Sequence, residues 1–245
     1  MLRSKKCLVT GGSRGLGLAI AKRFSDEGAT CILMARNREK LEAAREQLAT
    51  AAEDGALLRH NIVVGDVQDF ASKDYGKGVL DDVDVLVNAA GITQVSLLVR
   101  TSPNSIKSLV QTNLLGTIYA SQAFARNSIR ARKGGVIINF SSALAHRPVP
   151  GSSIYTATKA AVEGLTKALA VELGPANIRV NAISPGYIET DMTSAISEKA
   201  REKMMDRVPV KRFGTVEEVA EVALMLAMNE FMTGSVVNVD GGWSV

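Results

Sequence analysis

The sequence predicts an α/β fold: one doubly wound domain whose seven-stranded parallel sheet is flanked by helices. Seven short apolar runs alternate with longer segments of helical periodicity, and this alternation is typical of parallel strands joined by helical crossovers. Small or polar residues follow most of the runs, as they do where open α/β sheets bind ligands. The chain shows no internal repeat or linker, so a single domain is expected over residues 1–245. The predicted strands are residues 6–10, 30–35, 61–65, 83–87, 136–140, 179–183 and 235–239.

Composition places the chain among ordinary globular proteins. Hydrophobic residues make up 46% of it and charged residues 22%, and no apolar run approaches the roughly 18 to 20 residues of a membrane span. The net charge is +4, but no dense basic block with interleaved aromatic residues is present, so no nucleic-acid partner is predicted. No metal site is predicted either. Cys7 and Cys31 fall in predicted strands and are expected to be buried, reduced thiols.

The first strand, residues 6–10, runs directly into a glycine-rich turn and then into an apolar helical pattern that ends near Gly28. Strand, glycine turn and helix in this order form the phosphate-binding unit of dinucleotide sites, where glycines let backbone N–H groups approach the pyrophosphate. A glycine turn without a cofactor is the plainer alternative, but the position after the first strand argues against it. The predicted cofactor contacts in this loop are Gly11, Ser13, Arg14, Gly15, Leu16 and Gly17.

The second strand, residues 30–35, is followed by Arg36 rather than by a carboxylate. NAD sites usually carry Asp or Glu at the end of this strand for the ribose hydroxyls, and here the next acid is Glu39. Arg14 in the glycine loop faces the same region. Because guanidinium groups bind phosphate in a bidentate fork, Arg14 and Arg36 favour NADP, with its 2′-phosphate, over NAD. Either arginine alone could be an ordinary solvated charge.

The middle of the chain continues the alternation of strands and helices. A charged helix is predicted over residues 39–52, and the third and fourth strands lead into Asp66-Val67 and Asn88-Ala89-Ala90-Gly91. The helix predicted over residues 105–130 carries Asn113 close to its apolar stripe. A buried Asn needs hydrogen-bond partners. It is therefore either a satisfied structural residue or a sign of a backbone distortion or water site beside an active site.

Tyr155 and Lys159 are four residues apart at the start of a predicted helix, so both lie on one face of it. An ordinary phenol has a pKa of about 10. An ammonium one turn away favours the phenolate, and we expect it to lower the pKa of Tyr155 toward neutrality. The plainer alternative is a tyrosine packed on a lysine stem. Just upstream, Ser141 and Ser142 end the fifth strand and bring two hydroxyl groups to the edge of the sheet.

Two further segments carry functional expectations. Four basic residues close the helix before the fifth strand, and they either complement the helix C-terminus or form a docking patch for an acidic partner: Arg126, Arg130, Arg132 and Lys133. After the sixth strand and Pro185-Gly186, residues 188–210 lack a strong pattern and are predicted to form a mobile flap with short helices that selects the substrate. A helix predicted over residues 216–228 precedes the seventh strand.

Together these motifs make the chain resemble the short-chain dehydrogenase/reductase family over nearly its whole length. The matching features are the Thr10–Gly17 loop, Asp66, Asn88 to Gly91, Asn113, Ser142, Tyr155 with Lys159, and Pro185-Gly186. The resemblance implies a Rossmann domain and a catalytic tetrad made of Asn113, Ser142, Tyr155 and Lys159. Ser142 is preferred to Ser141 because the family serine lies about thirteen residues before the tyrosine.

The resemblance also implies a role for each of these residues. Ser142 binds the substrate oxygen, Tyr155 gives it a proton, Lys159 lowers the pKa of Tyr155 and holds the nicotinamide ribose, and Asn113 positions a relay water. The further cofactor contacts implied are Asp66 and Val67 at the adenine, Asn88, Ala89, Ala90 and Gly91 along the cofactor, and Pro185, Gly186, Ile188 and Thr190 near the nicotinamide or phosphates.

Within the family the likeness is greatest to 3-oxoacyl-[acyl-carrier-protein] reductases, through Gly91-Ile92-Thr93, Leu97–Arg100, Thr112–Leu114 and Pro185–Thr193. This implies NADPH-dependent reduction of a 3-oxoacyl thioester in fatty acid biosynthesis, an acidic acyl carrier protein as partner, and a homotetramer. The alternatives are a broad carbonyl or quinone reductase, a hydroxysteroid-type dehydrogenase, or a non-catalytic cofactor-binding subunit of a mixed tetramer. The compartment is left open between cytoplasm and mitochondrial matrix.

Overall fold

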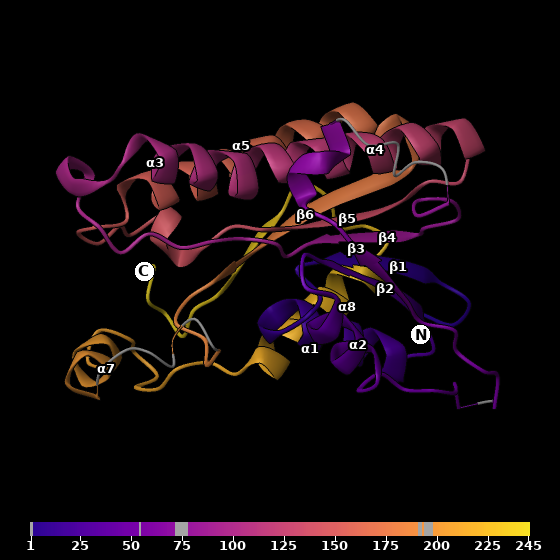
Figure 1. Ribbon diagram of the computed structural model, residues 1–245, viewed down its shortest axis with the longest axis horizontal. Coiled ribbons are helices and arrows are strands. Elements are labelled where there is room, and N and C mark those ends of the chain that lie inside the picture. Colours follow the sequence, from indigo (N-terminus) through magenta and orange to yellow (C-terminus); the bar gives the residue numbers. More distant parts are fainter. Residues whose placement is uncertain (1, 54, 72–77, 191–192, 194–197) are drawn as a thin grey trace.

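The computed structural model describes residues 2–53, 55–71, 78–190, 193 and 198–245, and it confirms the predicted doubly wound sheet (Figure 1). Seven parallel strands are arranged in the order β3-β2-β1-β4-β5-β6-β7. The order reverses between β1 and β4, and ligands of open α/β sheets bind outside the carboxyl ends of the strands at such a point. The strands are β1 (Lys6–Thr10), β2 (Thr30–Ala35), β3 (Asn61–Val64), β4 (Val85–Asn88), β5 (Gly135–Phe140), β6 (Ile178–Pro185) and β7 (Val236–Val239).

Helices cover both faces of the sheet (Figure 1). One face carries α1 (Gly15–Asp26), α2 (Arg38–Arg45) and α8 (Val216–Met228), and the other carries α3 (Pro103–Val110), α4 (Gly116–Ala131) and α5 (Ser153–Leu173). The short helix α7 (Glu198–Met205) lies apart from both layers, at one end of the molecule. Among the described residues, no helix combines the length and apolar character needed to cross a bilayer.

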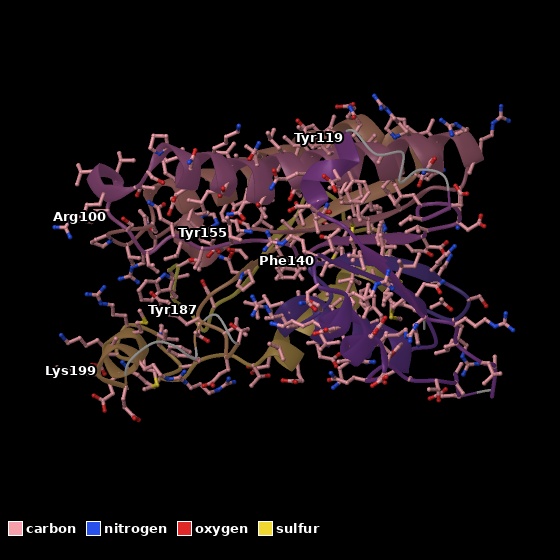
Figure 2. The ribbon with its side chains drawn as sticks, in the orientation of Figure 1. Arg100, Tyr119, Phe140, Tyr155, Tyr187 and Lys199 are labelled. Carbon is pink, nitrogen blue, oxygen red and sulfur yellow. The ribbon has the colours of Figure 1, made fainter. Side chains whose placement is uncertain are left out.

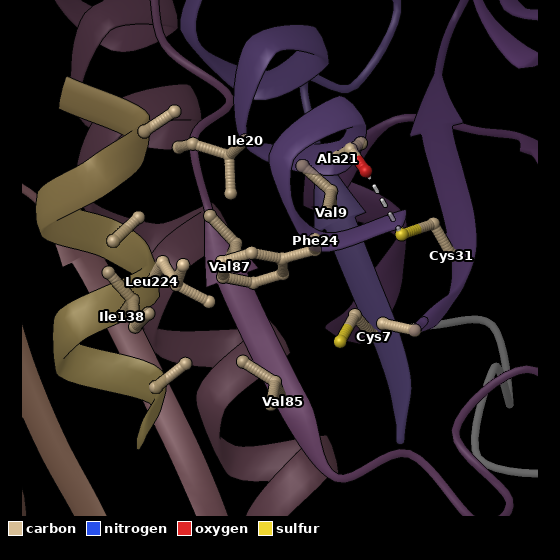
Figure 3. Packing of buried hydrophobic residues seen from close by; sticks show 14 of the residues in the cluster. Cys7, Val9, Ile20, Ala21, Phe24, Cys31, Val85, Val87, Ile138 and Leu224 are labelled. Carbon is tan, nitrogen blue, oxygen red and sulfur yellow. Dashed lines mark hydrogen bonds between the residues drawn. The ribbon is translucent and has the colours of Figure 1, made fainter. Parts of the chain in front are cut away.

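The core between β1, β4, α1 and α8 is made of buried apolar side chains (Figure 3). Phe24 of α1 lies against the sheet at Val87, and Leu224 of α8 closes the cluster from the other side. Cys7 and Cys31 are buried here as free thiols, as predicted. Burial raises the pKa of Cys31 to about 12 and that of Cys7 well above its ordinary value, so both are unreactive packing residues.

Two helices differ from their predicted bounds, for reasons visible in their contacts. The helix predicted over residues 39–52 ends at Arg45, because the following segment is bound elsewhere. The backbone N–H of Ala49 donates to Ser25 Oγ at 3.1 Å, and Ala49 O lies 2.6 Å from His60 Nε2. The other ring nitrogen of His60 accepts from the N–H of Cys31 at 3.0 Å and so extends the pairing with β2 to the residue before the start of β3.

The helix predicted over residues 105–130 is interrupted where Asn113 lies. A π-helical turn, Gln111–Leu115, separates α3 from α4. Such turns insert an extra residue into a helix and are frequent at functional sites. The structure thus confirms that a backbone distortion accompanies the buried Asn113, while the hydrogen bonds of its amide also fit the structural interpretation.

Candidate active site

A cavity of about 360 Å³ opens at the carboxyl ends of β1, β2 and β4, around the point where the strand order reverses. Its walls come from the glycine loop, the end of β2 and the segments that follow β3 and β4. Most of the residues predicted to contact a cofactor line it: Gly11, Ser13, Arg14, Gly15, Leu16, Gly17, Arg36, Asp66, Val67, Ala89, Ala90, Gly91 and Thr190. Residues that the sequence did not predict as cofactor contacts also line it: Met34, Ala35, Asn37, Lys40, Gly65, Ile92 and Thr112.

The glycine loop is shaped by close backbone approaches that admit no side chain. Gly11 has φ +68°, and a Cβ there would lie 2.8 Å from the backbone nitrogen of Ala90. A Cβ on Gly17 would lie 2.5 Å from the carbonyl oxygen of Gly11. The loop therefore closes against the end of β4 and presents the N-terminus of α1 to the cavity. Free N–H groups at a helix N-terminus attract phosphate, so this cradle fits a dinucleotide pyrophosphate.

Cationic side chains gather where the cavity meets the end of β2. Arg14, Arg36 and Lys40 all line the cavity. Arg36 is 76% exposed and lies 3.8 Å from a carboxylate oxygen of Asp66, so it remains accessible to an anion. Lys40 was not predicted from the sequence, although it lies in the first turn of the helix that follows Arg36, and this closeness is a signal that could have found it.

The predicted catalytic side chains converge beside this cavity. Ser142 follows β5, Tyr155 is the third residue of α5, and Lys159 lies one turn further along the same helix. The side chains of Ser142 and Tyr155 are hydrogen-bonded, and Lys159 Nζ lies 5.7 Å from the centre of the Tyr155 ring. This arrangement brings a hydroxyl donor, a phenol and a buried ammonium within reach of one substrate oxygen.

The electrostatics of Tyr155 correct one prediction. The sequence predicted that Lys159 lowers the pKa of Tyr155, but burial is the larger influence here and raises that pKa. The hydrogen bond with Ser142 lowers it in part. Burial also lowers the pKa of Lys159 to about 8, since desolvation disfavours the ammonium. Tyr155 is therefore kept as the protonated phenol, and Lys159 is the group whose pKa lies near neutrality.

Asn113 acts on the loop after β4 rather than pointing a free amide at the cavity. Its Oδ1 accepts from the N–H of Ile92 at 2.9 Å, and its Nδ2 donates to the carbonyl of Ile92 at 2.9 Å. A Cβ on Gly91 would lie 3.4 Å from Asn113 Oδ1 and 3.7 Å from Lys159 Nζ, so both side chains meet at this cavity residue. The amide thus ties the loop after β4 to the π-helical turn, and the relay water implied by the family resemblance stays a prediction.

Comparison with known proteins assigns this architecture. A family model described as enoyl-(acyl carrier protein) reductase, of the short-chain dehydrogenase/reductase type, matches residues 11–244. The chain is 42% identical over 251 aligned positions to the 3-oxoacyl-[acyl-carrier-protein] reductase FabG of Chlamydia muridarum, with 99% of this chain and 98% of the relative covered. The chain belongs to the short-chain dehydrogenase/reductase family.

Other members of the family extend the comparison. Carbonyl reductase family member 4 of Xenopus laevis is 40% identical, over 98% of this chain and 98% of the relative. A crystal structure from Agrobacterium tumefaciens, described as a candidate 2-deoxy-D-gluconate 3-dehydrogenase with bound NADP, superimposes with a TM-score of 0.87 at 32% identity, covering 99% of this chain and 97% of that one. The family, the fold and an oxidoreductase with a nicotinamide cofactor are therefore established.

Some residues that were expected to contact the cofactor lie outside the cavity and pack within the short-chain dehydrogenase/reductase fold instead. Asn88 is buried and donates to Ser121 Oγ and to Asn139 Oδ1, so its amide joins β4 to α4 and β5. Ile188 is buried in the core. A Cβ on Gly186 would lie 2.7 Å from the Cα of Asp240, which indicates close packing against the turn after β7. The side chain of Asn88, and Pro185, Gly186 and Ile188, are not among the cavity-lining residues.

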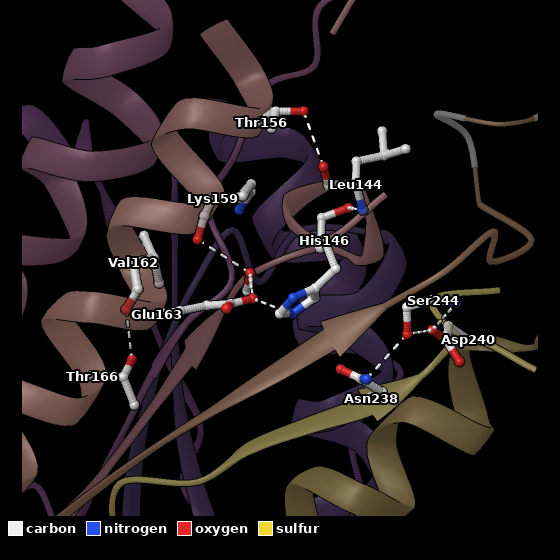
Figure 4. Close-up of polar contacts among 12 residues, drawn as sticks. Leu144, His146, Thr156, Lys159, Val162, Glu163, Thr166, Asn238, Asp240 and Ser244 are labelled. Atoms are coloured by element: carbon white, nitrogen blue, oxygen red, sulfur yellow. Dashed lines mark hydrogen bonds and ion pairs between the residues drawn. The ribbon is translucent and has the colours of Figure 1, made fainter. Parts of the chain in front are cut away.

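A buried carboxylate behind the catalytic serine was not predicted. Ser141 Oγ lies 2.6 Å from Glu163 Oε1 and 3.1 Å from the carbonyl oxygen of Lys159, and His146 Nε2 lies 3.0 Å from the same carboxylate oxygen (Figure 4). Ser141 therefore contacts two residues of α5, Lys159 and Glu163, while Ser142 lies next to Tyr155. This division supports the choice of Ser142 as the serine nearer to the chemistry.

Aromatic residues cluster where the predicted flap begins. Tyr187 stacks on Phe213 at 5.5 Å and meets Trp243 edge-on at 5.1 Å, while Arg147 donates to the carbonyl of Trp243 at 2.8 Å. Figure 2 places Tyr187 between Tyr155 and α7. The C-terminal Trp243 was not singled out by the sequence, because no periodic pattern connects it with Tyr187. Asp191 and Met192 of the flap motif lie outside the described residues.

Proposed function

We propose that the protein is an NADPH-dependent reductase that converts a 3-oxoacyl thioester, carried on acyl carrier protein, to the 3-hydroxyacyl form. The observation that carries this proposal is the convergence of Ser142, Tyr155 and Lys159 beside the cavity that the glycine loop lines. It occurs in a chain with 42% identity, over almost its full length, to a 3-oxoacyl-[acyl-carrier-protein] reductase.

The chemistry follows from the groups that the chain supplies. The bound cofactor provides the hydride that reaches the carbonyl carbon. Ser142 stabilises the charge that develops on the carbonyl oxygen by donating a hydrogen bond to it. Tyr155, held protonated by burial, transfers its proton to the same oxygen. Lys159, with a pKa of about 8, can restore a proton near neutral pH.

The preference for NADPH is argued from the charges at the end of β2. Arg14, Arg36 and Lys40 line the cavity there, where a ribose 2′-phosphate would lie. A carboxylate that follows this strand in NAD sites is replaced by Arg36. Guanidinium groups form strong charge-assisted hydrogen bonds with a phosphate and much weaker ones with a neutral hydroxyl. NADPH should therefore bind more tightly than NADH.

An acidic carrier protein matches the basic end of α4. Arg126, Arg130 and Arg132 are exposed there. Lys133 belongs to the fold instead, because its ammonium lies 3.3 Å from Asp84 Oδ1 and binds the carbonyl of Asp82. The docking patch that the sequence suggested is thus reduced to the three arginines, whose role is electrostatic steering of an acidic partner.

The proposed assembly is a homotetramer, the form that the family resemblance implies. Large apolar side chains are exposed on the two adjacent helices of one face, namely Ile129 of α4 and Val171 of α5, which is 81% exposed. Phe231, after α8, is fully exposed as well. Isolated exposed apolar residues are common, but burial at subunit interfaces would explain the exposure of all three residues at once. Sedimentation of the purified protein measures the state directly.

Steady-state assays with four substrates test the proposed function. Acetoacetyl-carrier protein, acetoacetyl-coenzyme A, a free ketone or quinone, and a 2-enoyl thioester are compared with NADPH and with NADH. We expect the highest kcat/KM with the carrier-bound ketone and NADPH. Equal kcat/KM for the free carbonyl would favour the broad carbonyl reductase to which the Xenopus relative points. Reduction of the enoyl thioester alone would assign the activity named by the family model instead.

A further inference from the structure

Gln94 lies in the loop after β4, six residues beyond the end of that strand, and its side chain is almost completely buried. Its Oε1 accepts hydrogen bonds from the backbone N–H groups of Ile154, at 2.8 Å, and Tyr155, at 3.1 Å. Its Nε2 donates to the carbonyl of Ser96 at 2.8 Å and to Thr101 Oγ1 at 3.2 Å. Both ends of the amide are therefore used. The reverse orientation would place an NH₂ group against two N–H donors, so these partners fix the orientation shown.

The cap that Gln94 provides is unusual because it comes from a distant part of the chain. Helix N-termini leave N–H groups without partners, and a side chain at the N-cap position normally accepts from them. Ser152 occupies that position in α5 and makes no such bond; its hydroxyl donates to Val149 O at 2.7 Å instead. The first turn of α5, which carries Tyr155, is thus held by a residue about sixty positions earlier in the chain.

The loop that carries Gln94 is held on its other side by a second member of the tetrad. Asn113 binds both the N–H and the carbonyl of Ile92, and Ile92 lines the cofactor cavity. Three consecutive residues, 92–94, therefore join the π-helical turn of Asn113 to the N-terminus of the helix of Tyr155. Thr158 adds a parallel link, since Asn113 Nδ2 donates to its hydroxyl at 3.3 Å and that hydroxyl donates to Tyr155 O at 2.7 Å.

We infer that Gln94 is a positioning residue for Tyr155: its amide oxygen caps the first turn of α5 and fixes where the phenol lies relative to Ser142 and the cavity. The inference rests on the proposed role of Tyr155 as proton donor. Tyr155 lies in the turn that the cap holds, so loss of the cap loosens this residue before it loosens the rest of α5. Displacement of a reacting group by about 1 Å can lower a rate by on the order of 10²-fold.

Two substitutions at one position test the inference. Gln94→Met keeps the length of the side chain and removes both hydrogen bonds to α5. Gln94→Glu keeps oxygens that accept from Ile154 and Tyr155 and loses only the donation to Ser96 and Thr101. In Gln94→Met we expect kcat for carbonyl reduction to fall by about 10- to 100-fold and KM for NADPH to change less than about twofold. In Gln94→Glu we expect kcat to recover most of that loss. The added carboxylate also raises the pKa of Tyr155, so the pH at which reduction declines should move upward in Gln94→Glu.

Amide hydrogen exchange gives a readout that does not depend on activity. Exchange of the Ile154 and Tyr155 amides should accelerate in Gln94→Met and return toward the wild-type rate in Gln94→Glu. Thr233→Val is the matched control, because Thr233 Oγ1 accepts from the N–H of Val180 in β6 at 3.0 Å. In this variant, exchange of the Val180 amide should accelerate and exchange of the Tyr155 amide should not.

The outcomes separate this inference from the proposed function. Unchanged protection of the Ile154 and Tyr155 amides in Gln94→Met, or unchanged kcat despite faster exchange, overturns the positioning role. A folded Gln94→Glu in which the Ile154 and Tyr155 amides stay protected while kcat does not recover overturns it as well, and this variant decides the matter if Gln94→Met does not fold. A wild-type protein that reduces no carbonyl substrate defeats the proposed function instead, while the exchange result still tests the cap.

Discussion

Lys159 Nζ donates a hydrogen bond to the carbonyl oxygen of Phe140 at 2.8 Å, so a catalytic helix and the end of β5 are joined two residues before Ser142. The ammonium is buried, and burial is the cause of its lowered pKa of about 8. The same contact that positions Lys159 therefore places a charge where solvation is poor. Function and stability make opposite demands on this side chain.

The first prediction concerns stability, through Lys159→Met. A lysine whose pKa is about 8 in the folded protein and 10.5 when unfolded is charged in both states below pH 8, and there the folded state bears the full desolvation cost. As pH rises from 8 to 10.5, the folded state loses the proton first and the cost disappears. The difference corresponds to about 3 kcal/mol. The stability of Lys159→Met relative to wild type should therefore be greatest below pH 8 and fall by about that amount by pH 10.5.

Denaturant unfolding of both proteins across this pH range measures the difference. Lys167→Met is the matched control, because Lys167 lies on the same helix and is exposed. Its difference from wild type should not vary with pH. Parallel curves for wild type and Lys159→Met would show that the ammonium of Lys159 is not desolvated in the folded protein.

The second prediction concerns the proton donor. Tyr155→Phe removes the only atom that can transfer a proton from this side chain and leaves the ring in place, so kcat should fall by about 10²- to 10⁴-fold. Binding of NADPH, followed by its fluorescence, should persist. Tyr119→Phe on α4 is the control, since Tyr119 packs against the buried apolar residues between the sheet, α4 and α5 and should retain full turnover. Wild-type turnover by Tyr155→Phe at neutral pH removes Tyr155 from the role of acid.

The third prediction uses the pH dependence of turnover. The hydrogen bond from Ser142 lowers the pKa of Tyr155, so Ser142→Ala should raise it further. Reduction requires the protonated phenol and declines as pH rises through its pKa. The alkaline decline of kcat in Ser142→Ala should accordingly occur at higher pH than in wild type, on a lower plateau. A decline at unchanged pH would mean that Ser142 does not act on Tyr155.

The fourth prediction concerns the shape of the phosphate cradle. Gly17→Ala places a Cβ 2.5 Å from the carbonyl oxygen of Gly11, so the loop must shift and nucleotide affinity should fall by at least tenfold, or about 1.4 kcal/mol. Gly164→Ala is the contrasting helical substitution. A Cβ there meets no described atom within 4 Å, and alanine should stabilise α5 by roughly 0.5–1 kcal/mol. Isothermal titration with NADPH and thermal unfolding distinguish the two effects.

Most of the fold and the catalytic side chains could be predicted because local signals carried them. A few neighbouring residues are enough to predict the geometry in two places. One is the strand-turn-helix at Gly11 to Gly17, and the other is the i, i+4 spacing of Tyr155 and Lys159. The pKa of Tyr155 could not be predicted in this way, since burial by surrounding segments outweighs the neighbouring charge. The predicted direction of the pKa shift was wrong because the prediction considered the charge of Lys159 and left out the burial of the Tyr155 phenol.

Long-range contacts account for the remaining differences. Gln94 and Tyr155 are 61 residues apart, and no pattern in the sequence links a loop glutamine with the start of that helix. Asn88 was expected at the cofactor, but its amide turns into the sheet toward Asn139, 51 residues later. Whether a polar residue at a strand end faces the cavity or the interior depends on side-chain orientation, which the order of residues does not specify.

The last prediction concerns cofactor choice at Arg36. Its side chain is exposed at the cavity, and its 3.8 Å ion pair with Asp66 is too exposed to contribute much to stability. Arg36→Asp should therefore leave unfolding nearly unchanged. It removes a charge-assisted bond to a 2′-phosphate, worth about 1.5–3 kcal/mol, and should weaken NADPH binding by about 10- to 100-fold. NADH binding should hold or improve, because an aspartate accepts from ribose hydroxyls. Arg38→Asp is the control, since Arg38 does not line the cavity and pairs with Glu42 on α2. Equal affinity of the wild type for NADH and NADPH, measured by titration, would exclude a 2′-phosphate site built on Arg14 and Arg36.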